Sequence, residues 1–226
     1  MLFNCGNYNV IRFSVFTEMD IASLQTLVLI HIGVFGGLRR GEMLGLDWDA
    51  IDFEQGVIHI KQSAARAGGE AFVKAPKSKC SLRTVAFPQP VMDWLKVWQQ
   101  EQERYREAVR DRWKGTGECV FIQKDGTRMD ISTPYNRFGR LLKKYNATVS
   151  EDMQLPVLSL HCLRHTNASL LVRSNKVDIV SVSKKLGHAD PNVTAKYYLH
   201  SFAEAEQETA DILGDMLLDS GVKVAK

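Results

Sequence analysis

The chain has few features of a secreted or membrane-spanning protein. Its four cysteines show no CxxC spacing, which argues against a disulfide framework or a zinc site and favours reduced, buried thiols. No charged N-terminal segment leads into a clean apolar stretch, and the apolar run over residues 27–35 is interrupted and too short to span a bilayer. We therefore expect a cytoplasmic protein with no membrane partner.

A large excess of one charge is also missing. The 29 Lys and Arg residues are nearly balanced by 26 Asp and Glu residues, so the net charge is only +3 and the pI about 8.6. This balance permits a polyanionic partner without predicting one by itself. With 226 residues and 45% hydrophobic content, the chain is long enough to form one good-sized domain or two small ones.

Hydrophobic periodicity predicts a mainly α fold (α+β) with a small three-stranded antiparallel β-sheet. An apolar helix is expected to begin at Thr17 to Asp20 and to end at Gly36-Gly37, with a short helix over residues 39–46 after it. Strands are predicted over residues 57–60, 70–73, 82–87 and 119–123, with the first three in the sheet. Further helices are predicted over residues 88–112, 133–145, 160–173, 177–186, 192–198 and 202–218, and a flexible connection over residues 150–156.

The forty residues that begin at His161 carry the strongest functional signal. His161 and Arg164 are three residues apart, so they share a helix face and can address one anion together. Gly187-His188 and a Tyr-Tyr pair follow, and Arg39 lies far upstream. Two arginines, two histidines and a tyrosine predict a phosphate ligand.

A tyrosine at such a site suggests covalent chemistry. The phenol has a pKa near ~10, so it is a weak nucleophile unless the electrophile is strongly stabilised. Paired guanidinium groups can neutralise the oxygens of a phosphodiester, a histidine can accept the phenol proton, and a lysine can protonate the leaving oxygen. A basic loop over residues 74–79 can supply that lysine, although a solvated turn explains the loop equally well. The product is a phosphotyrosyl bond, which needs no cofactor.

Four motifs in this order make the chain resemble the tyrosine recombinase (phage integrase) family, and it looks most like integrases of phages and conjugative transposons. They are Gly-Leu-Arg-Arg-Gly-Glu over residues 37–42, His-x-x-Arg-His over 161–165, Gly-His over 187–188 and Thr-Ala-Lys-Tyr-Tyr-Leu-His over 194–200. The resemblance implies the family's DNA breaking-rejoining catalytic domain over residues 17–226. Residues 1–16 are then a lead-in or linker remnant, the N-terminal core-binding domain is expected to be absent, and DNA affinity is expected to be weak.

The resemblance also implies a role for each matching residue. The implied catalytic residues are Arg39 and Arg164 (phosphate binding), Lys77 (general acid), His161, His188 (phosphate contact) and Tyr198 (nucleophile). Glu42 is implied to brace the site, and His165 to support it or to contact the DNA backbone.

Two positions keep an alternative. Tyr197 and Tyr198 follow His188 by nine and ten residues; we favour Tyr198, because its spacing and the His200 after it fit the integrase subgroup. Lys79 competes with Lys77, because strand slippage can exchange them. A metal pair of His161 and His165 is disfavoured, since no glutamate follows His161 and no third ligand is evident.

The implied function is site-specific recombination of double-stranded DNA at attachment-type sites through a covalent 3′-phosphotyrosyl intermediate, for integration or excision of a mobile element. A dimer-resolving recombinase, an invertase, a type IB topoisomerase and a catalytically silent DNA-binding accessory protein remain as alternatives. A homotetramer on DNA through the helix over residues 202–218 and a directionality factor are the further partners implied. Packing of that helix on its own chain is the alternative to the tetramer.

Overall fold

The computed structural model describes residues 3–5, 8–10, 21–67, 70–74, 82–156, 158–174 and 176–187. The α-helices are α1 (Ile21–Gly36), α2 (Arg40–Leu44), α3 (Gln89–Val109), α4 (Thr133–Asn146), α5 (Leu160–Arg173) and α6 (Ile179–Leu186). The 3₁₀ helices are η1 (Trp48–Ala50), η3 (Arg110–Arg112) and η4 (Glu151–Met153). The strands are β1 (Phe3–Cys5), β2 (Tyr8–Val10), β3 (Ile51–Asp52), β4 (Val57–Ile60), β5 (Ser63–Ala67), β6 (Glu70–Lys74) and β7 (Arg83–Ala86).

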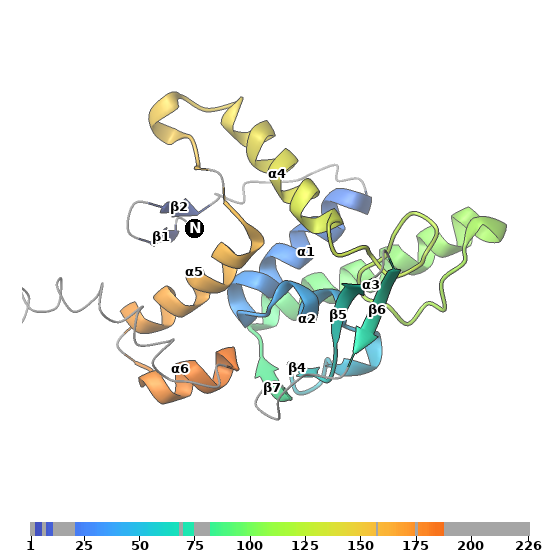
Figure 1. Ribbon diagram of the computed structural model, residues 1–226, viewed down its shortest axis with the longest axis horizontal. Coiled ribbons are helices and arrows are strands. Elements are labelled where there is room, and N and C mark those ends of the chain that lie inside the picture. The colour runs from blue at the N-terminus through green and yellow to red at the C-terminus, as the bar shows by residue number, and fades with distance from the viewer. Residues whose placement is uncertain are drawn as a thin grey trace, which may run out of the picture.

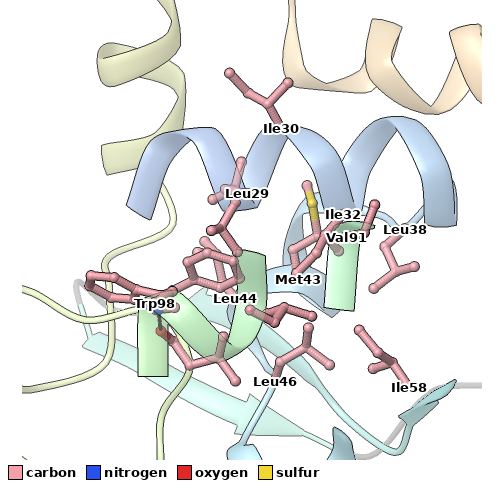
Figure 2. Packing of buried hydrophobic residues seen from close by; sticks show 14 of the residues in the cluster. Leu29, Ile30, Ile32, Leu38, Met43, Leu44, Leu46, Ile58, Val91 and Trp98 are labelled. Carbon is pink, nitrogen blue, oxygen red and sulfur yellow. Dashed lines mark hydrogen bonds between the residues drawn. The ribbon is translucent and has the colours of Figure 1, made fainter. Parts of the chain in front are cut away.

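Helix α1 runs through the middle of the fold, with α3, α5 and α2 packed against it (Figure 1). A helix that is apolar on all sides must be covered on all sides, and α1 buries Val28, Ile30 and Ile32 almost completely. Figure 2 shows side chains from α1, α2, α3 and β4 meeting in one core. Within the described ranges, no helix combines the length and the apolar character that a membrane crossing requires.

Helix α3 is amphipathic and closes the core from another side. Val91, Leu95, Trp98 and Gln102 follow at helical spacing and are buried, so they form one stripe facing α1. The Trp98 indole N–H donates to the carbonyl of Val120 at 2.7 Å, which satisfies the polar atom of a fully buried aromatic side chain.

The sheets differ in detail from the prediction. A three-stranded antiparallel sheet is present, but its order is β3-β4-β7, and the predicted strand at residues 70–73 belongs to a separate β5-β6 hairpin. The register of that hairpin pairs Ser63 with Lys74 and Ala67 with Glu70. β5 was missed because its sequence, Ser-Ala-Ala-Arg-Ala, has neither the alternation nor the β-branched residues that indicate a strand.

Two further predictions were wrong. Residues 119–123 form isolated bridges rather than a strand: Cys119 pairs with Asp47, and Ile122 with Arg128. The predicted flexible connection at 150–156 instead contains η4 and the buried Leu155, whose N–H and C=O are both bound by the amide of Asn146. The side-chain amide of Asn146 thus fixes the backbone of a segment in which hydrophobic periodicity predicts no helix or strand.

The predicted helices over residues 133–145 and 160–173 are confirmed as α4 and α5 to within a residue. α2 is shorter than predicted, because it ends at Leu44. The predicted helix start at Thr17 to Asp20 and the predicted helices over residues 192–198 and 202–218 lie outside the described residues.

Candidate active site

A tight turn between α1 and α2 presents Arg39. Gly37 has φ +63°, and a Cβ there would lie 2.6 Å from Leu186 Cδ2 and 2.8 Å from Asn167 Oδ1. Only glycine fits this left-handed and crowded position. Arg39 follows with φ −70° and ψ 151° as the residue preceding α2. The Gly-Leu-Arg part of the motif therefore aims one arginine at the space beside α5 and α6.

Arg39 is fastened to the first turn of α2 by Glu42. Its backbone N–H donates to Glu42 Oε2 at 2.8 Å, and its Nη1 donates to Oε1 at 2.8 Å. Its Nη2 donates to the carbonyl of Gly187 at 2.7 Å. The Arg39 side chain is still 39% exposed, against 5% for Glu42, so Arg39 can reach an anion from solvent.

Arg164 is a buried arginine on α5. Its Nη1 donates to the carbonyl of Gly37 and its Nη2 to the carbonyl of Leu186, both at 2.6 Å. A charged side chain this buried needs such partners. Because Leu186 and Gly187 are neighbours in the chain, the guanidinium groups of Arg164 and Arg39 are bound by consecutive carbonyls. The structure thus brings together the two arginines that the sequence predicted as a pair.

A third arginine, Arg83 at the start of β7, belongs to the same cluster. Its Nη1 and Nη2 donate to Glu42 Oε1 and Oε2 at 3.0 and 2.9 Å, and its Nε donates to the carbonyl of Lys185 at 2.8 Å. Burial raises the pKa of Glu42, but the hydrogen bonds and charge of Arg83, with the hydrogen bonds of Arg39, outweigh burial and hold the pKa below its ordinary value. Glu42 is therefore ionised, as bracing two arginines requires.

The two histidines of the HxxRH segment lie together on α5. The rings of His161 and His165 meet edge to face with their centroids 4.5 Å apart. Burial lowers the pKa of His161, and the charges of Arg164 and Arg39 lower it further. Burial, with the charges of His161 and Arg164, likewise lowers the pKa of His165. Both imidazoles are therefore neutral at pH 7, the form that accepts a proton.

The end of α6 leads into the rest of the predicted site. The N-terminus of α6 is capped by Asp178, whose Oδ1 accepts from the N–H groups of Val180 and Ser181 at 2.9 and 3.0 Å. Its C-terminus ends at Gly187 with φ +67°, a left-handed cap for which glycine is preferred. The predicted residues Lys77, His188, Tyr197 and Tyr198, with the alternative Lys79, lie outside the described residues.

Asn167 holds the opposite side of the turn that carries Arg39. Its amide N–H₂ donates to the carbonyls of Val34 and Phe35 at 2.7 and 3.1 Å, at the end of α1. No motif pointed to Asn167 or to Arg83. The only sequence signal for Asn167 is its place three residues after Arg164, on the same face of a helix.

These groups are suited to bind an anion. Arg39, Arg83 and Arg164 bring three positive charges to the C-terminal end of α6, and Glu42 is the carboxylate that pairs with two of them. Among the residues that the structure describes, no group of three or more His, Cys, Asp or Glu side chains is arranged to hold a metal ion. The described part of the site thus offers charge stabilisation and a neutral histidine for proton transfer.

Residues 10–205 match the family described as the phage integrase family. The ICEBs1 integrase of Bacillus subtilis (strain 168) is 31% identical over 182 residues, which are 80% of this chain and 46% of that protein. A protein named tyrosine recombinase XerC-like from Caldanaerobacter subterraneus subsp. tengcongensis is 29% identical over 209 residues, covering 86% and 50%. The chain therefore spans about half the length of the curated relatives it matches.

Solved structures agree. The Tn1549 transposon integrase in complex with circular intermediate DNA superimposes with a TM-score of 0.68 at 26% identity, over 86% of this chain and 63% of that one. XerA recombinase, at 20% identity, shares the fold with a TM-score of 0.57, over 81% and 58%. The predicted fold class, a mainly α domain with small antiparallel sheets as in tyrosine recombinase catalytic domains, is confirmed. With a family match that extends over most of its length, the chain belongs to the phage integrase family.

Proposed function

We propose that this chain is a site-specific recombinase that cleaves and rejoins double-stranded DNA through a covalent 3′-phosphotyrosyl intermediate at Tyr198. One observation carries the proposal. Arg39 and Arg164 are bound by the consecutive carbonyls of Gly187 and Leu186, next to a histidine whose pKa both arginines lower. Paired guanidinium groups beside a neutral imidazole are what in-line attack on a phosphodiester requires.

The arginines stabilise the phosphorane-like transition state. Arg39 is partly exposed and binds one non-bridging oxygen of the phosphate. Arg164 is buried, and its positive charge stabilises the same phosphate. Their backbone partners orient both guanidinium groups before the substrate arrives, so little reorganisation is needed during the reaction. Glu42 keeps Arg39 in place without reaching the substrate itself, since four hydrogen bonds occupy its carboxylate.

The covalent step exchanges one phosphate ester bond for another, so the energy of the phosphodiester bond is kept in the phosphotyrosyl bond. The Tyr198 oxygen forms a bond to phosphorus as the bond from phosphorus to the 5′ oxygen breaks. The phenol proton passes to neutral His161, and Lys77 protonates the departing 5′ oxygen. His188 contacts the same phosphate. Attack by a 5′ hydroxyl on the phosphotyrosyl bond reverses the step, so rejoining needs neither ATP nor a cofactor.

The composition and the exposed face of helix α4 support the proposal that DNA is the substrate. It contains two arginines and two lysines and no acidic residue. Asn136, Arg140 and Lys143 are exposed at spacings of four and three residues, so they share one face. Gly139 lies between them, and a Cβ added there would meet nothing within 4 Å. The fold thus gives no packing reason for a mid-helix glycine, whereas a DNA backbone that approaches closely does.

The biological role belongs to the same proposal. We assign integration or excision of a mobile element, because two of the relatives described above are integrases named for ICEBs1 and the Tn1549 transposon. Dimer resolution and inversion use the same chemistry and stay as alternatives. Attachment-type DNA sites, a homotetramer on DNA through residues 202–218, and a directionality factor complete the proposal.

A metal-free cleavage assay tests it. The chain is incubated in EDTA with a randomised library of nicked DNA duplexes, and covalent protein–DNA adducts are resolved on a denaturing gel. We expect adducts from the wild type and from the control Arg128→Lys, whose arginine binds Asp47 instead of Glu42 or the end of α6. Arg39→Lys should lower the rate of adduct formation by about 10²-fold, since it loses a directed donor on the developing charge. DNA binding without any covalent adduct would contradict the proposal and favour a silent accessory protein.

A further inference from the structure

Three consecutive backbone carbonyls at the C-terminal end of α6 each accept a hydrogen bond from an arginine. The pairs are Lys185 O with Arg83 Nε at 2.8 Å, Leu186 O with Arg164 Nη2 at 2.6 Å, and Gly187 O with Arg39 Nη2 at 2.7 Å. The last carbonyls of a helix have no partner within the helix, and the helix dipole makes this end negative. Three arginines, from α5, from β7 and from the residue before α2, satisfy it here.

Arg83 differs from Arg39 in what remains of its guanidinium group. All three of its nitrogens are used, Nε on the Lys185 carbonyl and both Nη atoms on the Glu42 carboxylate. Its side chain is 7% exposed, whereas that of Arg39 is 39% exposed. Arg83 is therefore placed to hold other groups rather than to meet a substrate.

The contacts of Arg83 close a ring of hydrogen bonds. From Glu42 the ring passes through Arg83 to the end of α6 and returns from Gly187 through Arg39 to Glu42. It joins α2, β7 and α6, which the chain connects only through long intervening segments. Removing Arg83 opens the ring on the side of β7.

We propose that Arg83 is a positioning residue for DNA cleavage, which sets the end of α6 against Glu42 and Arg39. The proposal rests on the recombinase function proposed above. Gly187 is followed directly by His188, so the same contact fixes the point from which the chain continues to the predicted phosphate contact and nucleophile. β7 also begins at Arg83, only six residues after Lys77 in the chain.

The geometry specifies arginine at this position. Binding both carboxylate oxygens of Glu42 requires the two-pronged guanidinium group, and the contact to Lys185 requires a third donor in the same plane. A lysine offers one ammonium group in place of this planar set. Arg83→Lys therefore keeps the charge but loses the geometry, which separates positioning from simple charge balance.

The test compares Arg83→Lys and Arg83→Gln with a matched control, Arg128→Gln. Arg128 also binds a carboxylate, Asp47, and backbone carbonyls, those of Leu44 and Leu46, but not α6. Three quantities are measured for each variant: the single-turnover cleavage rate at saturating protein, the Kd for the same DNA, and hydrogen exchange of the peptide that contains Lys185 to Gly187.

Positioning predicts a specific combination of results. In both Arg83 variants the cleavage rate falls by about 10-fold or more, the Kd changes by less than about twofold because binding contacts are kept, and the α6 peptide exchanges faster. Arg128→Gln changes neither the cleavage rate nor that peptide. Arg83→Lys guards against misfolding, since it keeps the positive charge beside Glu42.

Two results would overturn the inference. The first is a cleavage rate in the Arg83 variants no lower than in Arg128→Gln, and the second is unchanged exchange of the α6 peptide. If the wild type itself forms no adduct, the recombinase function fails, and the exchange measurement alone decides whether Arg83 holds α6.

Discussion

Glu42 accepts two hydrogen bonds from Arg39, one from its backbone N–H and one from its side chain, each at 2.8 Å. The first is the capping contact that starts α2, and the second holds a predicted catalytic side chain. One carboxylate therefore couples local folding to the geometry of the site. Arg83 takes the remaining positions on both oxygens.

Glu42→Gln should destabilise the fold strongly. The substitution keeps the shape of the side chain but leaves the buried guanidinium of Arg83 without its counter-charge, and breaking a buried pair costs about 3–5 kcal/mol. We expect the free energy of unfolding in urea to fall by about 3 kcal/mol, because the glutamine oxygen keeps part of the hydrogen bonding.

Asp49→Asn is the matched control for Glu42→Gln. Asp49 pairs with Lys61 at 3.4 Å, and both side chains are more than half exposed, so the loss should stay below about 1 kcal/mol. Equal losses for the two variants would show that Glu42 does not act as a buried counter-charge.

His161 and His165 should titrate below the ordinary histidine pKa of about 6.5. Burial and the neighbouring charges lower the pKa of both rings. The unfolded chain therefore binds more protons than the folded chain below pH 6.5, so the contribution of these rings to stability is complete above pH 6.5 and is lost as the pH falls through the folded pKa.

Side-chain NMR measures this directly. Two-dimensional spectra of the imidazole groups are recorded across the pH range and assigned with His161→Asn and His165→Asn. A pKa at or above 6.5 for His161 would contradict the lowering by burial and by the arginine charges, and a pKa above 7 would contradict its role as a neutral proton acceptor at pH 7.

Gly139→Ala should stabilise the free protein and weaken its DNA complex. Alanine is more favourable than glycine inside a helix by about 0.5–1 kcal/mol, and the added Cβ meets no atom within 4 Å. On DNA, the same methyl group would stand between α4 and the approaching backbone. Thermal unfolding tests the expected rise in stability, and DNA titration tests the expected loss of affinity. An unchanged DNA affinity would show that this face of α4 does not contact DNA.

Replacing Arg140 and Lys143 together by glutamine should reduce the salt dependence of DNA binding. Each lost phosphate contact lowers the slope of log Kd against log salt by about 1, so a reduction of about 2 is expected for the pair. Arg104→Gln on α3 is the control, because Arg104 is 70% exposed on another helix. An effect of equal size in Arg104→Gln would mean that α4 is not the DNA-binding face.

Sequence patterns predicted the helices well where apolar periodicity and cap residues agree. Leu160–Arg173 is the clearest case, because Ser159 precedes it and Ser174 and Asn175 follow it. They also predicted that Arg39, Glu42 and Arg164 belong to one site, because the motifs that carry these residues keep their order. The residue types of the described part of the site could therefore be predicted from the sequence, whereas their contacts could not.

The supporting contacts could not be predicted in the same way. Arg83 looks like any charged residue at the edge of a strand, and its function depends on contacts to residues 41 and 102 positions away. Residues 119–123 read as a strand, yet Gln25, Trp98 and Gln102 bind their backbone groups. The contacts of Arg83 and the conformation of residues 119–123 both depend on residues distant in sequence, which a local sequence pattern does not reveal.

The identity of the residue that carries the DNA after cleavage tests the central claim most directly. Adducts are formed in EDTA on nicked duplexes, digested with nuclease and trypsin, and sequenced by tandem mass spectrometry. Trypsin cleaves after Lys196, so Tyr197 and Tyr198 lie in one peptide and their fragment ions distinguish them. We predict a 3′-phosphate on Tyr198, with no adduct from Tyr198→Phe and normal adduct from Tyr197→Phe. A nucleotide on Tyr197, on any other residue, or linked through a 5′-phosphate would contradict this account.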